Sequence, residues 1–131
     1  MPPNGFVVMV IEDERDIRES LHECLTDSGY EVLSAENGRQ ALTQLQTVIR
    51  SVHAIVLDIQ MPIMNGEAFR WEQLADPSLA HIPVLVLSAS PKCQTVAVKL
   101  RSAGCIRKPF DIDELLETLA GICLPQESND T

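Results

Sequence analysis

The sequence predicts an α/β fold in which a parallel β-sheet is covered by helices on both faces. Five short apolar segments alternate with five segments in which apolar residues recur at helical spacing. The connections between them are too short for anything but right-handed crossovers, so successive strands should lie parallel. With 131 residues, 45% of them hydrophobic, the chain is expected to form one domain whose core needs neither disulfides nor a structural metal.

The first strand is predicted over residues 6–11, where the run FVVMVI is continuously apolar, as in strands buried on both faces of a sheet. The next helix carries apolar residues on one face from Ile17 to Leu25 and should end at Gly29. The other predicted strands share the short apolar pattern and cover residues 30–35, 54–57, 83–87 and 105–107. Helices are predicted between them and after the last strand, over residues 41–49, 66–75, 95–104 and 111–122.

Polar residues stand at the ends of four predicted strands. They are Glu12 and Asp13 after the first strand, Asp58 after the third, Ser88 after the fourth and Lys108 after the fifth. The carboxyl ends of parallel strands share one edge of the sheet, where open α/β folds bind ligands, so these side chains should converge. A single acid at a strand end is more often a helix cap or a solvated turn residue, but here three acids meet.

The three acids favour a bound cation and phosphoryl chemistry. Like charges about 4 Å apart repel by about 4 kcal/mol at an effective dielectric constant near 20, so the cluster should take up protons or hold a cation. Mg²⁺ is commonly held by one or two carboxylates together with phosphate oxygens. Lys108 then supplies a positive charge, and Ser88 a hydroxyl donor, for an incoming phosphoryl group. Asp58 is the candidate nucleophile, because a carboxylate can attack phosphorus to give an acyl phosphate.

Four segments at these strand ends resemble the receiver domain of two-component response regulators, the CheY-like superfamily. They are VVMVIEDE, IVLDIQMPIMNG, IPVLVLSAS and CIRKPF, and the resemblance covers about residues 6–123. It implies a flavodoxin-like (βα)5 three-layer sandwich with strand order 2-1-3-4-5. A receiver domain is accordingly expected over residues 1–124, and the polar composition of PQESNDT predicts a flexible tail over residues 125–131.

The resemblance implies that Asp58 accepts a phosphoryl group from the phosphohistidine of a histidine kinase or phosphotransfer protein. The reaction would depend on Mg²⁺, with Mn²⁺ as a substitute. Asp13 would ligate the metal directly and Glu12 mainly through water, while Asp58 and the backbone carbonyl of Gln60 complete the implied ligand set. Such a chain is not an enzyme on other substrates, because it catalyses only its own phosphorylation and dephosphorylation.

The resemblance also assigns the phosphoryl contacts. Ser88, Lys108 and the backbone N–H of Ala89 would contact the phosphoryl oxygens, and the Lys108–Pro109 peptide bond is expected to be cis. Pro109 also fits the first turn of a helix, and a sequence does not decide the isomer.

Two residues depart from the family pattern. The first acid is Glu12, where aspartate is commoner. Cys105 stands where the family usually carries the tyrosine or phenylalanine that turns inward when the switch hydroxyl, here Ser88, moves toward the phosphate. A cysteine at this position of the implied switch puts the usual signalling route in doubt.

The four cysteines contain no C-x-x-C pair and no histidines lie at ligand spacing, so they predict neither zinc nor a redox dithiol. We expect them to be buried or inert reduced thiols in a cytoplasmic protein. The formal charge of −9 argues against direct nucleic-acid or membrane partners. The expected partners are the phosphodonor, a downstream effector and, as a further candidate, a second copy bound through the fourth helix, fifth strand and fifth helix.

Other functions fit less well. An aspartate-nucleophile phosphatase usually carries a second aspartate two residues after the nucleophile, where this chain has Gln60. A degenerate receiver used only for docking would normally have lost Asp58, Lys108 or an acid. Flavin binding, suggested by fold analogy alone, would need a phosphate-cradling loop after the first strand, where this chain is acidic.

Overall fold

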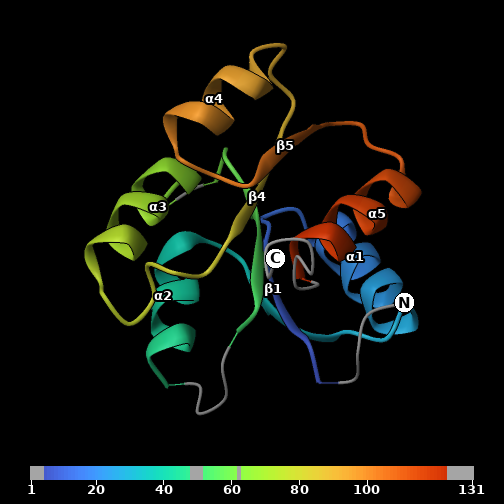
Figure 1. Cartoon of the computed structure of the whole chain (residues 1–131), viewed down its shortest axis with the longest axis horizontal. Coiled ribbons are helices and arrows are strands. Elements are labelled where there is room, and N and C mark those ends of the chain that lie inside the picture. The colour runs from blue at the N-terminus through green and yellow to red at the C-terminus, as the bar shows by residue number, and fades with distance from the viewer. Residues whose placement is uncertain (1–4, 48–51, 62, 124–131) are drawn as a thin grey trace, which may run out of the picture.

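The computed structural model describes residues 5–47, 52–61 and 63–123. Within these residues, five parallel strands form one sheet in the order β2-β1-β3-β4-β5. The strands are β1 (Val7–Ile11), β2 (Glu31–Ala35), β3 (Ala54–Asp58), β4 (Val84–Ser88) and β5 (Gly104–Arg107). Figure 1 shows the sheet nearly edge-on, with helices on both sides of it. The predicted parallel sheet and its implied strand order are confirmed.

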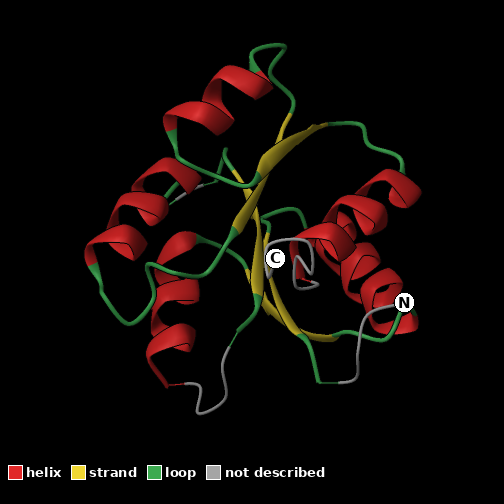
Figure 2. Ribbon diagram, viewed as in Figure 1, coloured by secondary structure: helices red, strands yellow, loops and turns green. Residues whose placement is uncertain are grey.

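Helices cover both faces of the sheet (Figures 1 and 2). On one face lie α1 (Arg15–Asp27) and α5 (Ile112–Cys123). On the other lie α2 (Gly38–Thr47), α3 (Gly66–Ala75) and α4 (Cys93–Lys99). The molecule therefore has three layers, as the resemblance implied.

Side-chain alternation along the strands divides the core in two. Val8 and Val10 of β1 pack in the cluster beneath α1 and α5, whereas Met9 and Ile11 pack in the cluster beneath α2, α3 and α4. Neighbouring residues of a strand point to opposite faces, so a strand buried on both sides has to be apolar throughout. This requirement explains the uninterrupted apolar runs of the sequence.

The helix boundaries agree with prediction except around α4. The first helix ends as expected, with Gly29 at a φ of 104° directly after the cap residue Ser28. The fourth helix was expected to run to Gly104, but α4 ends at Lys99 and Gly104 opens β5. Arg101 adopts a φ of 54°, which stops the helix three residues before the glycine. Residues 48–49 of the second predicted helix and the tail 125–131 lie outside the described residues.

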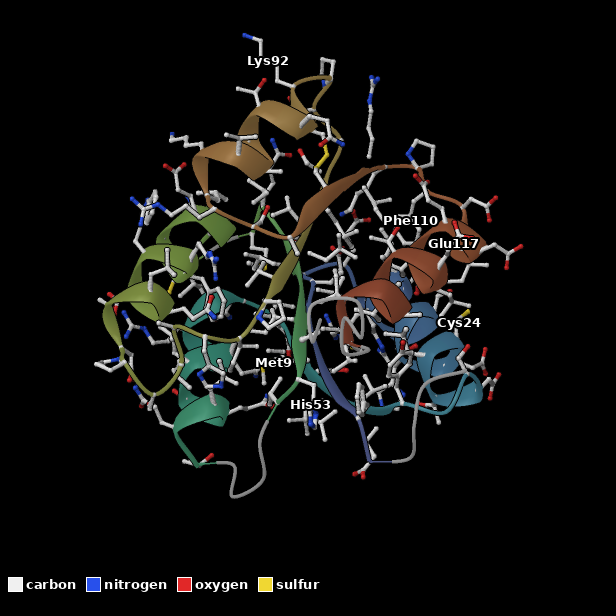
Figure 3. All side chains as sticks on the ribbon, viewed as in Figure 1. Met9, Cys24, His53, Lys92, Phe110 and Glu117 are labelled. Atoms are coloured by element: carbon white, nitrogen blue, oxygen red, sulfur yellow. A yellow bond between two sulfur atoms is a disulfide. The ribbon has the colours of Figure 1, made fainter. Side chains whose placement is uncertain are left out.

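Two of the four cysteines correct the sequence-based expectation. Cys93 and Cys105 form a disulfide, with their Cα atoms 5.7 Å apart, whereas Cys24 and Cys123 are free. The sulfur–sulfur bond lies beside α4 in Figure 3. The partners are 12 residues apart and belong to a helix and a strand, so their proximity depends on how α4 packs on the sheet. No short sequence motif indicates such a pair. The prediction that all four cysteines are reduced thiols was therefore wrong for Cys93 and Cys105.

None of the helices in the described part of the chain has the length and apolar character needed to cross a membrane.

Candidate functional site

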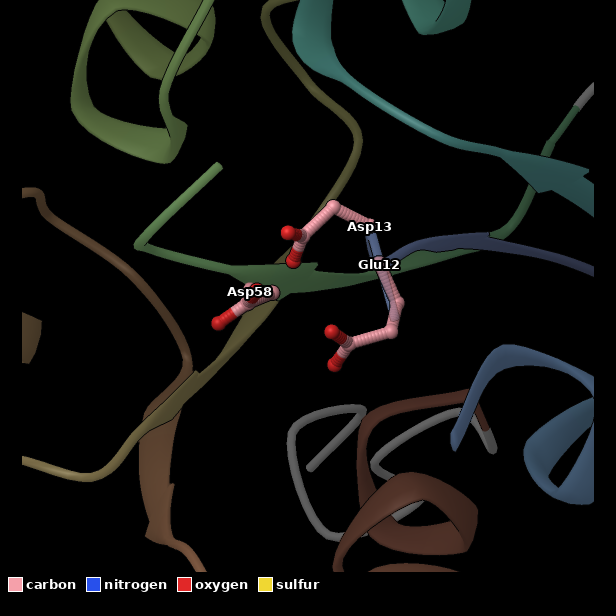
Figure 4. Close-up of side chains that lie close together, drawn as sticks. All are labelled: Glu12, Asp13 and Asp58. Carbon is pink, nitrogen blue, oxygen red and sulfur yellow. The ribbon is translucent and has the colours of Figure 1, made fainter. Parts of the chain in front are cut away.

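The topology brings the predicted acids to one edge of the sheet. Glu12 and Asp13 directly follow β1, while Asp58 is the last residue of β3, the strand beside it. One carboxylate oxygen from each of the three acids lies within 4.8 Å of the other two. Figure 4 shows the three carboxylates gathered at the ends of these two strands. The convergence expected from strand order is therefore present.

The three acids differ in exposure. The side chain of Glu12 is fully buried and Asp58 is only 3% exposed, whereas Asp13 is half-buried. Two carboxylates are thus held away from water while the third borders it. A hard cation could reach this cluster from solvent and would find oxygen donors only, which is the donor chemistry that Mg²⁺ and Ca²⁺ prefer. The acidic cluster fits a metal site.

Lys108 supplies the opposing charge. Its Nζ donates hydrogen bonds to Glu12 Oε1 at 2.9 Å and to Asp58 Oδ1 at 3.2 Å. Burial alone would lower the pKa of Lys108, but the hydrogen bond with Glu12 and the charge of Asp58 outweigh burial and raise it. The lysine therefore stays charged, and it leaves an excess of negative charge among the three acids.

This excess negative charge is visible at Asp58. Burial, reinforced by the charge of Glu12, raises the pKa of Asp58 from 3.8 to about 7, although Lys108 acts in the opposite direction. A carboxyl group with this pKa is only partly ionised at neutral pH in the absence of a cation. Because burial and the charge of Glu12 both oppose ionisation of Asp58, a bound cation would favour its ionised form.

The backbone around the site is held by contacts that sequence reasoning missed. Arg18, in the first half of α1, donates from Nη1 to the carbonyl oxygens of Glu12 at 2.9 Å and Asp13 at 3.3 Å. It thereby fixes the turn that carries the two acids. The only signal for this role in the sequence was the position of an arginine shortly after the acidic end of a strand. That signal is weak, because an arginine on an amphipathic helix is usually an ordinary surface residue.

Gly66 is the second residue that was missed. A Cβ atom at this position would lie 2.6 Å from the carbonyl oxygen of Asp58 and 2.8 Å from the Cα of Ile59. Its N–H donates to the carbonyl of Ile59 at 2.9 Å, so the start of α3 packs directly on the end of β3. The signal in the sequence was the pair Asn65–Gly66, where Asn65 also caps the helix by accepting from the N–H of Ala68 at 2.8 Å.

The remaining predicted residues lie at the same edge. Ser88 ends β4, is 3% exposed, and accepts at its Oγ from the N–H of Ser90 at 3.1 Å. Ala89 and Gln60 are exposed in the loops that follow β4 and β3. The Lys108–Pro109 peptide bond is cis, as expected, and the N–H of Lys108 donates to the carbonyl of Ser88 at 2.8 Å. The roles given to these residues toward a metal or phosphoryl group stay predictions.

A cavity of about 740 Å³ opens beside Lys108, between α1 and the turn into α5. Its walls are mainly apolar and include Ile17, Leu21, Cys24, Pro109 and Phe110. Lys108 of the site thus stands in the wall of a cavity that is otherwise formed by α1 and the residues leading into α5.

Comparisons with known proteins agree with this architecture. A family model described as "Response regulator receiver domain" matches residues 8–120. Transcriptional regulatory protein CrdR of Helicobacter pylori is 33% identical over 111 residues, which make up 82% of this chain and 50% of that protein. Sensor histidine kinase TmoS of Ectopseudomonas mendocina is 32% identical over 111 residues, 82% of this chain but 11% of TmoS.

Solved structures show the same relationship. The structure of chemotaxis protein CheY4 of Vibrio cholerae matches with a TM-score of 0.80 at 30% identity, covering 89% of this chain and 98% of CheY4. This chain thus spans nearly the whole of CheY4 but half the length of CrdR. The family match, the CheY-like strand order and the acidic edge together lead to one conclusion: the chain belongs to the response regulator receiver family.

Proposed function

We propose that this chain is the phosphoacceptor module of a two-component relay, with Asp58 as the residue that is phosphorylated. The observation that carries the proposal is the placement of Asp58 at the tip of β3. There it is buried, lies next to two further acids and accepts a hydrogen bond from Lys108. A carboxylate in this position is rigidly supported by the sheet and still borders the half-buried Asp13, where a phosphodonor can approach.

The reaction is a transfer of a phosphoryl group between two nucleophiles. A carboxylate oxygen of Asp58 attacks phosphorus and forms an O–P bond, while the N–P bond of the donor phosphohistidine breaks and its electron pair stays on the imidazole. Lys108 carries positive charge toward the phosphoryl oxygens, and the hydroxyl of Ser88 and the N–H of Ala89 donate hydrogen bonds to them. These groups stabilise the negative charge that spreads over the phosphoryl group during transfer.

Glu12, Asp13 and Asp58 are the residues that would hold Mg²⁺, or Mn²⁺ in its place, with the backbone carbonyl of Gln60 as a further ligand. When bound, the metal neutralises charge on the phosphoryl oxygens. The oxygen donors, the half-buried access at Asp13 and the raised pKa of Asp58 support this assignment.

The proposed partners follow from the same chemistry. The phosphodonor is a histidine kinase or a histidine phosphotransfer protein, and the recipient of the signal is an effector protein or domain. We further propose a cytoplasmic location and a homodimer that forms through α4, β5 and α5. The proposed receiver domain extends over residues 1–124 and is followed by a polar tail over residues 125–131. The phosphatase alternative is not favoured, because the family match is to receivers and Gln60 occupies the place of the second aspartate.

The test is phosphorylation by a small phosphodonor. The chain is incubated with acetyl phosphate and Mg²⁺, and intact-mass spectrometry records the addition of one phosphoryl group that hydroxylamine removes. Asp58→Asn should abolish the addition, because an amide has no anionic oxygen to attack phosphorus. Asp27→Asn, an exposed aspartate of α1, is the matched control and should be labelled like the unmodified chain. Undiminished labelling of Asp58→Asn at a single site, or an unlabelled parent chain, would overturn the proposal.

A further inference from the structure

Both cysteines of the disulfide lie, in the sequence, between two of the residues proposed to contact the phosphoryl group, Ser88 and Lys108. Cys93 is the first residue of α4 and follows Ser88 by five positions, while Cys105 lies in β5, three positions before Lys108. The Cα atoms of the two cysteines are 5.7 Å apart, within the usual range for a disulfide, so the fold brings the thiols together without displacement of the backbone. The bond therefore joins the first residue of α4 to β5.

A hydrogen-bonded turn connects Ser88 to the disulfide. The N–H of Ser90 donates to Ser88 Oγ at 3.1 Å, the N–H of Lys92 donates to Ser90 Oγ at 3.0 Å, and the N–H of Cys93 donates to the carbonyl of Ser90 at 3.2 Å. Any movement of the Ser88 hydroxyl toward a phosphoryl group on Asp58 disturbs the first of these bonds. Through the turn, the disturbance reaches the first residue of α4.

The helix α4 depends on anchors at its two ends. It has seven residues, too few for a helix to be stable through its own hydrogen bonds, and no side chain caps its N-terminus. Its C-terminal end is held by the buried Arg70 of α3, which donates to the carbonyls of Leu100 at 2.9 Å and Arg101 at 2.7 Å. At the N-terminal end, the disulfide ties Cys93 to β5.

The noncovalent contact beside this tether is weak by comparison. Gln94 Nε2 donates to the carbonyl of Cys105 at 3.2 Å, and Gln94 itself is exposed. With the sulfur–sulfur bond present, the start of α4 cannot leave β5. With it reduced, the start of α4 is held by packing and by such contacts alone, while the Arg70 anchor still holds the far end.

We infer that Cys93 and Cys105 are a reversible thiol–disulfide pair that controls whether phosphorylation of Asp58 moves α4. This inference rests on the proposed function of Asp58 as phosphoacceptor. In the oxidised chain the start of α4 is fixed to β5, and the response of the segment from Ser88 to Lys99 is suppressed. In the reduced chain the segment is free to respond.

The oxidant belongs to the class of low-molecular-weight disulfides, and the exchange balances. One thiolate of the pair attacks a sulfur of the oxidant and releases one small thiol. The second thiolate then attacks the mixed disulfide, forms the Cys93–Cys105 bond and releases a second small thiol. The pair loses two electrons and two protons, which leave with the two released thiols. A dithiol reductant attacks one sulfur of the bond, then closes to a cyclic disulfide, and so returns both cysteines to thiols while it is itself oxidised.

Because both cysteines are buried, thiol–disulfide exchange at this pair depends on opening of α4. Cys93 is 4% exposed and Cys105 is 9% exposed, so a small disulfide reaches either sulfur only when the first turn of α4 opens. A static structural crosslink would show no such relation to the phosphorylation state. For a reversible pair, the rate of thiol–disulfide exchange should change when a phosphoryl mimic occupies the site at Asp58.

The experiment compares the oxidised and reduced forms of the full chain. Each form is prepared with glutathione disulfide or with dithiothreitol, and its thiol count is verified by alkylation and mass spectrometry. Amide hydrogen exchange over residues 88–99 is then measured with and without beryllofluoride, which mimics a phosphoryl group. We expect beryllofluoride to change exchange in the reduced form at least threefold more than in the oxidised form. Returning the oxidised chain to dithiothreitol should restore the larger change.

Two variants sharpen the comparison. Cys93→Ser should behave like the reduced chain under both conditions, whereas Cys24→Ser, which removes a free cysteine of α1, should keep the redox dependence. Equal responses to beryllofluoride in the two redox forms would overturn the inference, and so would two thiols that glutathione disulfide never oxidises. Labelling of the reduced chain by acetyl phosphate separates the two proposals. Absent labelling defeats the phosphoacceptor function itself, whereas normal labelling with a redox-independent response defeats only the control by the cysteine pair.

Discussion

Protons and Mg²⁺ should compete for Asp58, and the competition gives a measurable dependence of metal affinity on pH. Because burial and Glu12 raise the pKa of Asp58 to about 7, the carboxyl group is about 10% ionised at pH 6 and about 90% ionised at pH 8. A metal that requires the ionised form should therefore bind about tenfold more weakly at pH 6 than at pH 8. At pH 7 the binding of each ion should release about half a proton.

Isothermal titration calorimetry with MgCl₂ checks both values. Affinities are measured at pH 6 and pH 8, and the proton release at pH 7 is obtained from buffers that differ in ionisation enthalpy. Asp58→Asn is the control, since it lacks the titrating group and should bind Mg²⁺ weakly with little dependence on pH in this range. Equal affinities at pH 6 and pH 8, or the same pH dependence in Asp58→Asn, would refute the role given to the Asp58 proton.

The same raised pKa predicts how the metal-free chain responds to pH. The folded state binds the Asp58 proton more tightly than the unfolded state, whose pKa is near 3.8. Stability should therefore fall as the pH rises from about 4 to about 7 and change little above that, by up to about 4 kcal/mol from this group. Urea denaturation in the presence of a chelator should show this fall, and Asp58→Asn should lack it. Saturating Mg²⁺ should restore stability to the parent chain at pH 8.

Three further predictions concern the acidic cluster, the glycines of α3 and α5, and the anchor at the end of α4. Asp13→Asn should weaken Mg²⁺ binding more than Glu12→Gln, because Glu12 is already engaged by the lysine of the site; calorimetry that finds equal losses contradicts this order. Gly66→Ala should cost about 1–3 kcal/mol of stability, since a Cβ would overlap the end of β3, whereas Gly121→Ala in the open last turn of α5 should stabilise by up to about 0.5–1 kcal/mol in the same denaturant assay. Arg70→Met should cost about 3 kcal/mol, because it removes the donor from the buried Leu100 carbonyl, from the buried Gln73 Oε1 and from the partly buried Arg101 carbonyl; a loss below about 1 kcal/mol would show that the anchor is dispensable.

The sequence predicted the acidic edge because its geometry follows from topology alone. Once strands are parallel, residues that follow their carboxyl ends must share one edge, however far apart they stand in the chain. Glu12 and Asp58 are 46 positions apart, yet one rule about strand direction places them together. The family resemblance supplied the strand order that makes β1 and β3 neighbours, and the structure confirms it.

The contacts around α4 were not predictable in this way. The end of this helix is set by Arg70, which lies 30 positions from Leu100 and finds its partners only when α3 and α4 pack side by side. Arg70 is 4% exposed and donates to the carbonyls of Leu100 and Arg101 and to Gln73 Oε1, which are all uncharged, so no charge pattern in the sequence marks it. The disulfide has the same origin, because Cys93 and Cys105 meet only after the helix lies on β5. Contacts between side chains of different helices and strands depend on how these elements pack, and the hydrophobic periodicity of the sequence does not specify that packing.

The family resemblance leads us to expect an aromatic ring where this chain has Cys105, and under the proposed function this difference should change which part of the molecule carries a signal. Cysteine has one heavy atom beyond Cβ, so it cannot sweep into the space that Ser88 would vacate on moving toward a phosphoryl group. We expect the backbone turn from Ser88 to Cys93 to take up that movement instead, because its hydrogen bonds link the serine to the start of α4. In this chain the turn ends at the sulfur that is bonded to Cys105. Under the two proposals, Cys105 therefore has two effects. It provides no ring that could move, and it supplies the second sulfur of the disulfide. That disulfide restrains the turn from Ser88 to Cys93, which is the segment expected to carry the signal.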